Sequence, residues 1–208
     1  MPIETLATFV MASALLSLAP GPDNLFVLVQ SALYGRKSGV LITLGLCSGL
    51  IAHTAAVSLG VAALLQASPL AFDLLKLLGA CYLLWLAWQA FRASASSLDA
   101  GESYALSAMT LYRRGIIMNI TNPKVSIFFL AFLPQFAVPE AGDFALQMLL
   151  LGGVFMIVAL VIFSIIALLA GSLGEWLRKA PKAQVVLNRI AGMVFLALAI
   201  KLTYATVS

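Results

Sequence analysis

Two polar, proline-containing breaks constrain this chain most, because each is set inside an apolar run long enough to cross a lipid bilayer. The breaks consist of Pro20, Gly21, Pro22, Asp23 and Asn24 in the first half, and of Asn122, Pro123 and Lys124 in the second. Proline lacks a backbone N–H and is tolerated best in the first turn of a helix. Pro22 and Pro123 therefore each predict the end of one helix and the start of another.

The spacing after each break predicts its depth in the membrane. From Pro22 to the turn at Gly35 is 13 residues, and from Pro123 to Phe136 is again 13. At about 1.5 Å per residue, such a segment is roughly 20 Å long, against a hydrocarbon core of about 30 Å. Both helices are expected to restart near the middle of the membrane. Interrupted segments at corresponding positions of two halves are the best sequence indication of a transporter's binding site.

The composition supports an all-α polytopic membrane protein. The chain is 62% hydrophobic and only 10% charged, and its mean hydropathy is +1.07. Six apolar runs reach the ~20 residues that a spanning helix needs. They are predicted at about 3–33, 39–65, 70–91, 115–136, 144–173 and 185–204. We expect a single transporter domain over residues 1–208, surrounded by the lipid bilayer. No pattern favours nucleic acid as a partner.

The basic residues predict the orientation of the chain. Nine of the twelve Lys and Arg residues follow the first, third and fifth runs, which places these connections in the cytoplasm by the positive-inside rule. Both termini are then periplasmic. Residues 1–91 form one three-helix repeat, residues 92–113 a cytoplasmic linker, and residues 114–208 a second repeat. Because each repeat has an odd number of spans, the two repeats run in opposite directions through the membrane.

Two ionisable residues, Asp23 and Lys124, are predicted to lie deep in the hydrocarbon. A buried charge there is costly, so each needs a partner or a water-filled cavity. One alternative is a mutual salt bridge that clamps the halves together. The other is a zwitterion-binding site in which Asp23 faces an ammonium and Lys124 a carboxylate. A lysine in the first turn of a helix opposes the helix dipole, and residues that break a local rule tend to mark functional sites.

Several neutral polar residues are predicted beside the two charges. Asn24, Asn119 and Asn122 can hydrogen-bond a substrate, and Asn122 is also a good N-cap for the helix that begins at Pro123. Asp23 is the predicted proton-coupling group. The single histidine, His53, is a second candidate because an imidazole titrates near neutral pH, although a lone histidine within a span is more often a hydrogen-bonded packing residue.

Other classes of membrane protein fit the sequence less well. Cys47 and Cys81 both lie in the first half, whereas a thiol–disulfide carrier of this design needs one cysteine in each half. A metal-ion exporter would have to bind a cation beside Lys124, and no ligand spacing suggests a tetrahedral site. A non-transporting assembly protein stays open as a third reading. We expect neither an enzyme nor a bound cofactor or metal.

At these residues the chain resembles the LysE/RhtB family of small bacterial exporters. Matches to the family pattern occur along nearly the whole chain. They include Pro20-Gly21-Pro22, Gly35-Arg36-Lys37-Ser38-Gly39, Gly45, Gly49, His53, Leu59 to Leu65, Gly79, Tyr82-Leu83 and Trp88 in the first half, and Arg114-Gly115, Asn119, Asn122-Pro123-Lys124, Phe128-Phe129 and Phe132 to Phe136 in the second.

The resemblance implies export of neutral or basic amino acids or their derivatives by proton antiport across the bacterial inner membrane. A homodimer is compatible with six thin helices. One position departs from the pattern: many members carry an acid directly after the second-span glycine, where this chain has Leu50. Substrate or stoichiometry is expected to differ if that acid belongs to the site.

Overall fold

The computed structural model describes residues 1–61, 68–93, 106–138, 142–179 and 181–207, and these residues are helical with no strand among them. In the first half the helices are α1 (Ile3–Leu18), α2 (Pro22–Tyr34), α3 (Arg36–Ala55), a π-helical turn η1 (Ala56–Val61) and α5 (Pro69–Arg92). In the second half they are α6 (Ala108–Thr121), α7 (Pro123–Ile127), a π-helical turn η2 (Phe128–Phe132), a 3₁₀ turn η3 (Leu133–Phe136), α8 (Phe144–Lys179) and α9 (Pro181–Val207).

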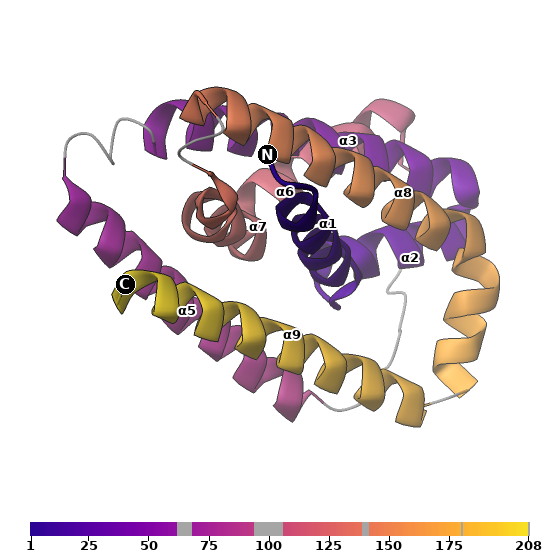
Figure 1. Ribbon diagram of the computed structural model, residues 1–208. Helices are drawn as coiled ribbons and strands as arrows, with labels where there is room; N and C mark the ends of the chain where they lie inside the picture. The colour runs from indigo at the N-terminus through magenta and orange to yellow at the C-terminus, as the bar shows by residue number, and fades with distance from the viewer. Residues whose placement is uncertain (62–67, 94–105, 139–141, 180, 208) are drawn as a thin grey trace.

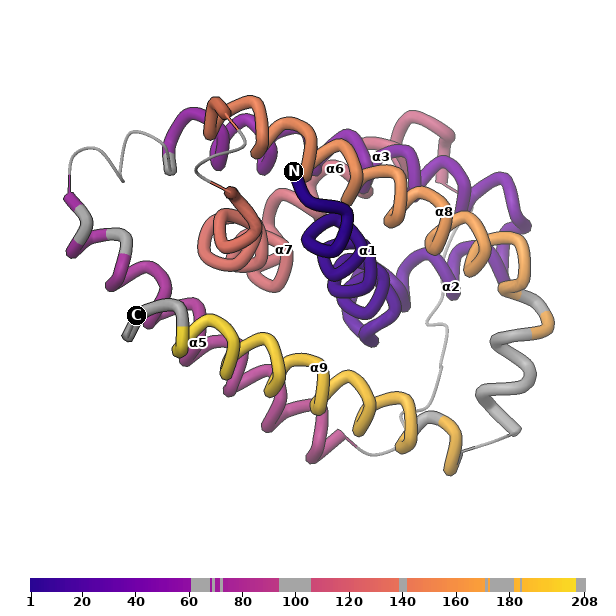
Figure 2. The backbone as a smooth tube through the Cα atoms, viewed as in Figure 1, coloured from indigo at the N-terminus to yellow at the C-terminus, as the bar shows by residue number. Residues whose placement is uncertain are grey.

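The long helices form two layers, with α1 and α7 between them. In Figure 1, α3 and α8 run along one edge, α5 and α9 along the other, and α1 and α7 are seen nearly end-on between the layers. Figure 2 follows the backbone from α1 through α2 into α3, and shows α9 lying beside α5. Helices from both halves therefore pack on each other within each layer, and α5 and α9 reach the remaining helices mainly through α1, α7 and η2.

The predicted spans are confirmed in number if each bent pair counts as one span. Four helical segments are long and apolar enough to cross a membrane alone, at Arg36–Gly60, Asp73–Arg92, Phe144–Ala170 and Val185–Tyr204. The pair α1 and α2 bends by 59° and the pair formed by α6 and the segment Pro123–Phe136 bends by 51°. Both bends fall where the prolines predict them, because Pro22 and Pro123 each occupy the first turn of a new helix.

The predicted element bounds differ from the structure in two places. The linker expected at residues 92–113 ends earlier, because α6 begins at Ala108, where Ser107 accepts a hydrogen bond from the Thr110 N–H at 3.2 Å. This N-cap lies outside the apolar run, so hydropathy alone misses it. The half-helix after Pro123 is also less regular than predicted, since it changes from α to π to 3₁₀ geometry before Phe136.

Glycines let α3 approach its neighbours closely. A methyl group on Gly45 would meet the Tyr112 carbonyl and the Cα of Gly115, so α3 and α6 cross at almost backbone contact. One turn further, Gly49 faces the Asn119 side chain. These contacts hold α6, and with it the second break, against α3.

A cluster of phenylalanines fills the space beside the second break. Phe128, Phe129, Phe132 and Phe136 are fully or almost fully buried, and Phe128 and Phe129 pack on Phe155 of α8 with ring centroids 5.2 and 5.1 Å apart. Aromatic rings at this spacing pack favourably edge-on or tilted. The cluster forms a rigid support under the segment that carries Lys124.

Candidate functional site

The two breaks meet through the side chain of Asn122. Its Oδ1 accepts a hydrogen bond from the Lys124 backbone N–H at 3.0 Å, which confirms the predicted N-cap. Its Nδ2 donates to Oδ2 of Asp23 at 2.8 Å. One amide side chain therefore caps the second break and binds the acid of the first, and all three residues are buried.

Lys124 binds the end of α1 rather than the Asp23 carboxylate. Its Nζ donates to the carbonyl oxygens of Leu16 at 3.4 Å and Ala19 at 3.2 Å. A methyl group on Gly21 would lie 3.1 Å from Nζ, so this glycine leaves room for the ammonium. The predicted clamp, a direct salt bridge between Asp23 and Lys124, is not formed, although the two charges are close enough to influence each other.

The binding of Lys124 to α1 explains why a lysine is tolerated in the first turn of α7. The ammonium opposes the dipole of its own helix, but it lies against free carbonyls at the C-terminal end of α1 (Ile3–Leu18), where a positive charge is favourable. Lys124 therefore stabilises the end of a helix that is distant in sequence. A ligand that accepts hydrogen bonds from this ammonium would compete with those carbonyls.

The remaining predicted residues lie around the same point. Asn24 donates from Nδ2 to the Ser17 carbonyl at 2.7 Å, which holds α2 against α1 across the first break. The Asn119 backbone carbonyl is 3.1 Å from Nε2 of His53. Within the described part of the chain, no group of three His, Cys, Asp or Glu residues is placed to hold a metal ion.

A small cavity of about 10 Å³ lies beside Asp23. Its wall includes Ser17 of α1, Asn119 of α6 and Lys124, and it is otherwise apolar. Leu50 also lines it, so the position at which this chain departs from the resembling family is next to Asp23. The Oγ of Ser17 and the Oδ1 atoms of Asp23 and Asn119 have no hydrogen-bond partner in the protein.

A much larger cleft, of about 730 Å³, opens on the other side of Lys124. The two breaks form one wall of this cleft, and α5 and α9 form the other. The lining residues are Pro20, Gly21, Pro22, Leu25, Asn122, Pro123 and Lys124 from the breaks and α2, Tyr82, Trp85, Leu86, Gln89, Ala90 and Ala93 from or just after α5, and Leu187, Asn188, Ala191 and Phe195 from α9.

Lys124 supplies the only charge among the described residues that line the cleft. Asp23 does not line it, and its unpartnered oxygen is beside the small cavity instead. Lys124 borders both spaces. The arrangement is suited to a molecule with one anionic group and an otherwise neutral, partly apolar body.

Sequence reasoning missed the wall of the cleft on α5. Tyr82 and Trp85 lie on this wall with Gln89, and the centroids of their rings are 5.3 Å apart. Positions 82, 85, 86 and 89 share one helical face, so polar Gln89 within that apolar stripe was the available signal. Ser17 and Asn188 gave no comparable signal in the sequence.

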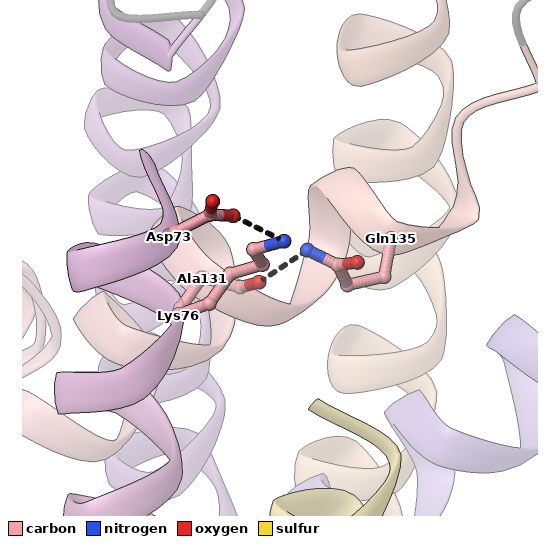
Figure 3. Close-up of polar contacts among 4 residues, drawn as sticks. All are labelled: Asp73, Lys76, Ala131 and Gln135. Carbon is pink, nitrogen blue, oxygen red and sulfur yellow. Dashed lines mark hydrogen bonds and ion pairs between the residues drawn. The ribbon is translucent and has the colours of Figure 1, made fainter. Parts of the chain in front are cut away.

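The cleft lies toward one end of the α5–α9 pair, and the opposite end packs on η2 and reaches Phe136 of η3 through Lys201. There Nζ of Lys201 on α9 is 3.8 Å from the centroid of the Phe136 ring. On α5, the buried Lys76 forms an ion pair with Asp73 at 2.8 Å, and Figure 3 shows this pair beside Gln135, which donates to the Ala131 carbonyl. A methyl on Gly79 would meet Ala131, so α5 and η2 are in close contact at this level.

These features define a multi-pass membrane protein with a buried polar site at two helix breaks. A family model described as LysE type translocator matches residues 14–206. The chain therefore belongs to the family of LysE type translocators, which are membrane transporters and not enzymes, and this confirms the resemblance read from the sequence.

Relatives cover almost the full chain. It is 36% identical over 197 residues to the homoserine/homoserine lactone efflux protein of Salmonella typhimurium (94% of each chain). A leucine efflux protein of Enterobacter sp. is 29% identical over 199 residues (94% of this chain and 93% of that protein). An uncharacterised membrane protein of Vibrio cholerae is 34% identical over 197 residues (94% and 95%). No solved structure matches the chain.

Proposed function

We propose that the protein exports neutral amino acids or their derivatives from the cytoplasm by proton antiport, through one central site at the two helix breaks. The observation that carries this proposal is the position of Lys124, the single described charge in a cleft built from both breaks and from α5 and α9. The names of the relatives, which are efflux proteins for homoserine, homoserine lactone and leucine, support the substrate class.

In the proposed complex the substrate carboxylate accepts hydrogen bonds from the Lys124 ammonium. The carboxylate would replace the Leu16 and Ala19 carbonyls, which Lys124 contacts at 3.4 and 3.2 Å. A charged acceptor binds an ammonium more strongly than a neutral carbonyl does. The rings of Tyr82 and Trp85 face the substrate body, and a ring face also suits an ammonium group. No carboxylate lines the cleft among the described residues, so a basic side chain would find no partner there.

Asp23 has a different role in this proposal. Because its free oxygen lies beside the small cavity and not in the cleft, we assign to it the coupling proton rather than the substrate ammonium. The Asn122 amide connects this acid to the segment that carries Lys124. Substrate binding at Lys124 and proton binding at Asp23 can therefore influence each other without direct contact.

The same proposal includes alternating access between the two sides of the bacterial inner membrane. With both termini periplasmic, the end of the cleft near Ala93 and Leu187 faces the cytoplasm. Lys201 and Phe136 then close the periplasmic end. Both halves consist of a broken pair followed by two long helices, which supports the inverted repeat. We propose that the α5–α9 pair rocks against the other helices, since it contacts them over a limited area.

A transport assay with matched substrates tests the role of Lys124. Proteoliposomes containing the protein are loaded with homoserine, homoserine lactone or leucine, and release is followed with the proton gradient imposed and collapsed. The lactone has the body of homoserine but no carboxylate. A net hydrogen bond to a charged group contributes about 1.5–3 kcal/mol, so Lys124→Met should weaken homoserine transport by roughly 10- to 150-fold.

The lactone provides the internal control, and Lys182→Met provides the matched variant because Lys182 is an exposed lysine at the start of α9. Lactone transport by Lys124→Met should fall much less than homoserine transport, and Lys182→Met should transport both normally. Equal losses for homoserine and its lactone would show that Lys124 does not bind a substrate carboxylate. Failure of the unaltered protein to release any of the three substrates would refute the proposed function.

A further inference from the structure

The small cavity beside Asp23 is lined by three residues that each carry a buried oxygen without a partner. These oxygens are Oγ of Ser17, Oδ1 of Asp23 and Oδ1 of Asn119, and each side chain is at least nine-tenths buried. All three residues line the cavity of about 10 Å³. An unpartnered polar group in a protein interior is costly, and three of them around one space indicate a ligand site rather than three separate defects.

The hydrogen-bonding capacities of the three groups match one water molecule. The carboxylate and amide oxygens can only accept hydrogen bonds, whereas the Ser17 hydroxyl can also donate one. A water that donates to Asp23 and Asn119 and accepts from Ser17 satisfies all three groups. A cavity of this volume holds about one water, and two to four polar partners are what a buried water requires.

A metal cation fits the same space less well. Lys124 also lines the cavity, and its positive charge opposes a second cation at this distance. Three protein oxygens are also fewer than the six or so that a hard cation takes. The hydrogen-bond count and the charge at Lys124 both favour a neutral ligand.

The position of the water determines how Asp23 can exchange a proton. Oδ2 of Asp23 already accepts the Asn122 amide at 2.8 Å, so Oδ1 is the oxygen free to bind a proton. That oxygen lies beside the small cavity, on the α3 and α8 side of Lys124, with Leu50 and Phe155 in the wall. The substrate cleft lies toward α5 and α9. The two described basic side chains near Asp23 are Lys124 and His53.

We propose that Ser17, Asp23 and Asn119 hold one water molecule that delivers the coupling proton to Asp23, by a route separate from the substrate cleft. The water passes one of its protons to Oδ1 of Asp23 in the same step in which it receives another from a hydronium outside the cavity, so it stays neutral beside Lys124. An O–H bond forms on Asp23 as one breaks on the water, a new O–H bond forms on the water as one breaks on the outer hydronium, and release is the reverse. This inference rests on the proposed function, because it assigns a path to the proton of that antiport.

The test compares two serines on the same helix. Ser17→Ala removes the donor to the water, whereas Ser13→Ala is the matched control: Ser13 is equally buried one turn earlier, but its hydroxyl donates to the Phe9 carbonyl at 2.7 Å. Two transport modes are measured in proteoliposomes. Exchange of labelled for unlabelled homoserine without a proton gradient needs only substrate binding and alternation, whereas accumulation driven by a proton gradient also needs the coupling proton.

Ser17→Ala should keep exchange within about twofold and lower proton-driven accumulation roughly tenfold or more, while Ser13→Ala should keep both. Equal loss of exchange and accumulation in Ser17→Ala, or loss of neither, would overturn the inference and leave the proposed function intact. A requirement for Na⁺ at a fixed proton gradient would also overturn it, since a cation would then occupy the cavity. Absence of proton-driven transport in the unaltered protein would overturn the proposed function itself.

Infrared spectroscopy detects the water without any transport. A bound water gives an O–H stretching band that shifts when H₂¹⁸O replaces H₂O. The band should be present in the unaltered protein and in Ser13→Ala, and absent in Ser17→Thr, whose added methyl group occupies a cavity of about 10 Å³. A spectrum of the unaltered protein without such a band, or persistence of the band in Ser17→Thr, would contradict the proposed water site.

Discussion

Replacing Gly45 by alanine should destabilise the protein through the crossing of α3 and α6. A Cβ atom on Gly45 would lie 3.0 Å from Cα of Gly115, 3.1 Å from N of Ile116 and closer still to the Tyr112 carbonyl. Non-bonded carbon atoms prefer about 3.5–4.0 Å, so the two helices would have to separate by roughly 1 Å. The hydrogen bond between His53 and the Asn119 carbonyl crosses the same interface at 3.1 Å, and it would be stretched beyond useful length.

The expected cost follows from two opposing effects. Overpacking a close contact costs about 1–3 kcal/mol, and alanine in place of a helical glycine recovers roughly 0.5–1 kcal/mol. The free energy of unfolding should therefore fall by about 0.5–2 kcal/mol, which for a chain of this size lowers Tm by roughly 1–8 °C. Gly153→Ala is the matched control, because a methyl group there meets no atom within 4 Å.

The Tm of each purified variant is measured in detergent. Samples are heated to a series of temperatures, and the folded protein that remains is quantified by size-exclusion chromatography with fluorescence detection. Gly153→Ala should match or exceed the Tm of the unaltered protein, while Gly45→Ala should fall below it and should also transport more slowly. If the two variants had the same Tm, close helix contact at Gly45 would not be what positions the second break.

Three further substitutions test separate parts of the structure. Leu50→Ala removes a buried side chain beside Asp23 and should lower the free energy of unfolding by about 2–5 kcal/mol, whereas Ile51→Ala, at an exposed neighbour, should be nearly neutral in the same thermal assay. Trp85→Ala should raise the KM for homoserine several-fold, because the Trp85 ring lines the cleft. Trp88→Ala loses a stacked arginine at the helix surface and should leave KM unchanged. Similar KM values for the two variants would refute a substrate-binding wall on α5. Lys201→Met removes a cation–π contact of about 0.5–2 kcal/mol and should increase opening of the end that we propose to be periplasmic about 2- to 30-fold. Opening is measured by labelling a cysteine introduced at Leu86 in the cleft with an impermeant maleimide. Unchanged labelling would show that the contact does not close that end.

The sequence predicts the positions of the helices and breaks well because both depend on local chemistry. Pro22 and Pro123 begin new helices wherever the chain places them, and Asn122 caps the second of these as its residue type predicts. The glycines of α3 permit close packing, but the sequence does not identify α6 as the partner. The end of the linker is harder to predict, because Ser107 caps the start of α6 in a polar segment where hydropathy gives no signal.

The sequence predicts which residues form the candidate site but not how they contact each other. The two breaks predict that Asp23 and Lys124 lie close together, but the hydrogen-bond partners of each side chain depend on long-range packing. Lys124 contacts carbonyls more than a hundred residues earlier, and Asp23 contacts an amide 99 residues later. Sequence periodicity also cannot show that Tyr82 and Trp85 line a cleft rather than contact lipid, because that distinction depends on where α9 and the breaks lie.

The contribution of α5 and α9 to the cleft has a consequence for the diversity of such carriers. These two helices supply the wall of aromatic, amide and aliphatic side chains, whereas Lys124, Asp23 and the Asn122 bridge belong to other segments. If the proposed function holds, a few exchanges on these two helices should change which cargo is accepted while the polar residues at the breaks keep their geometry.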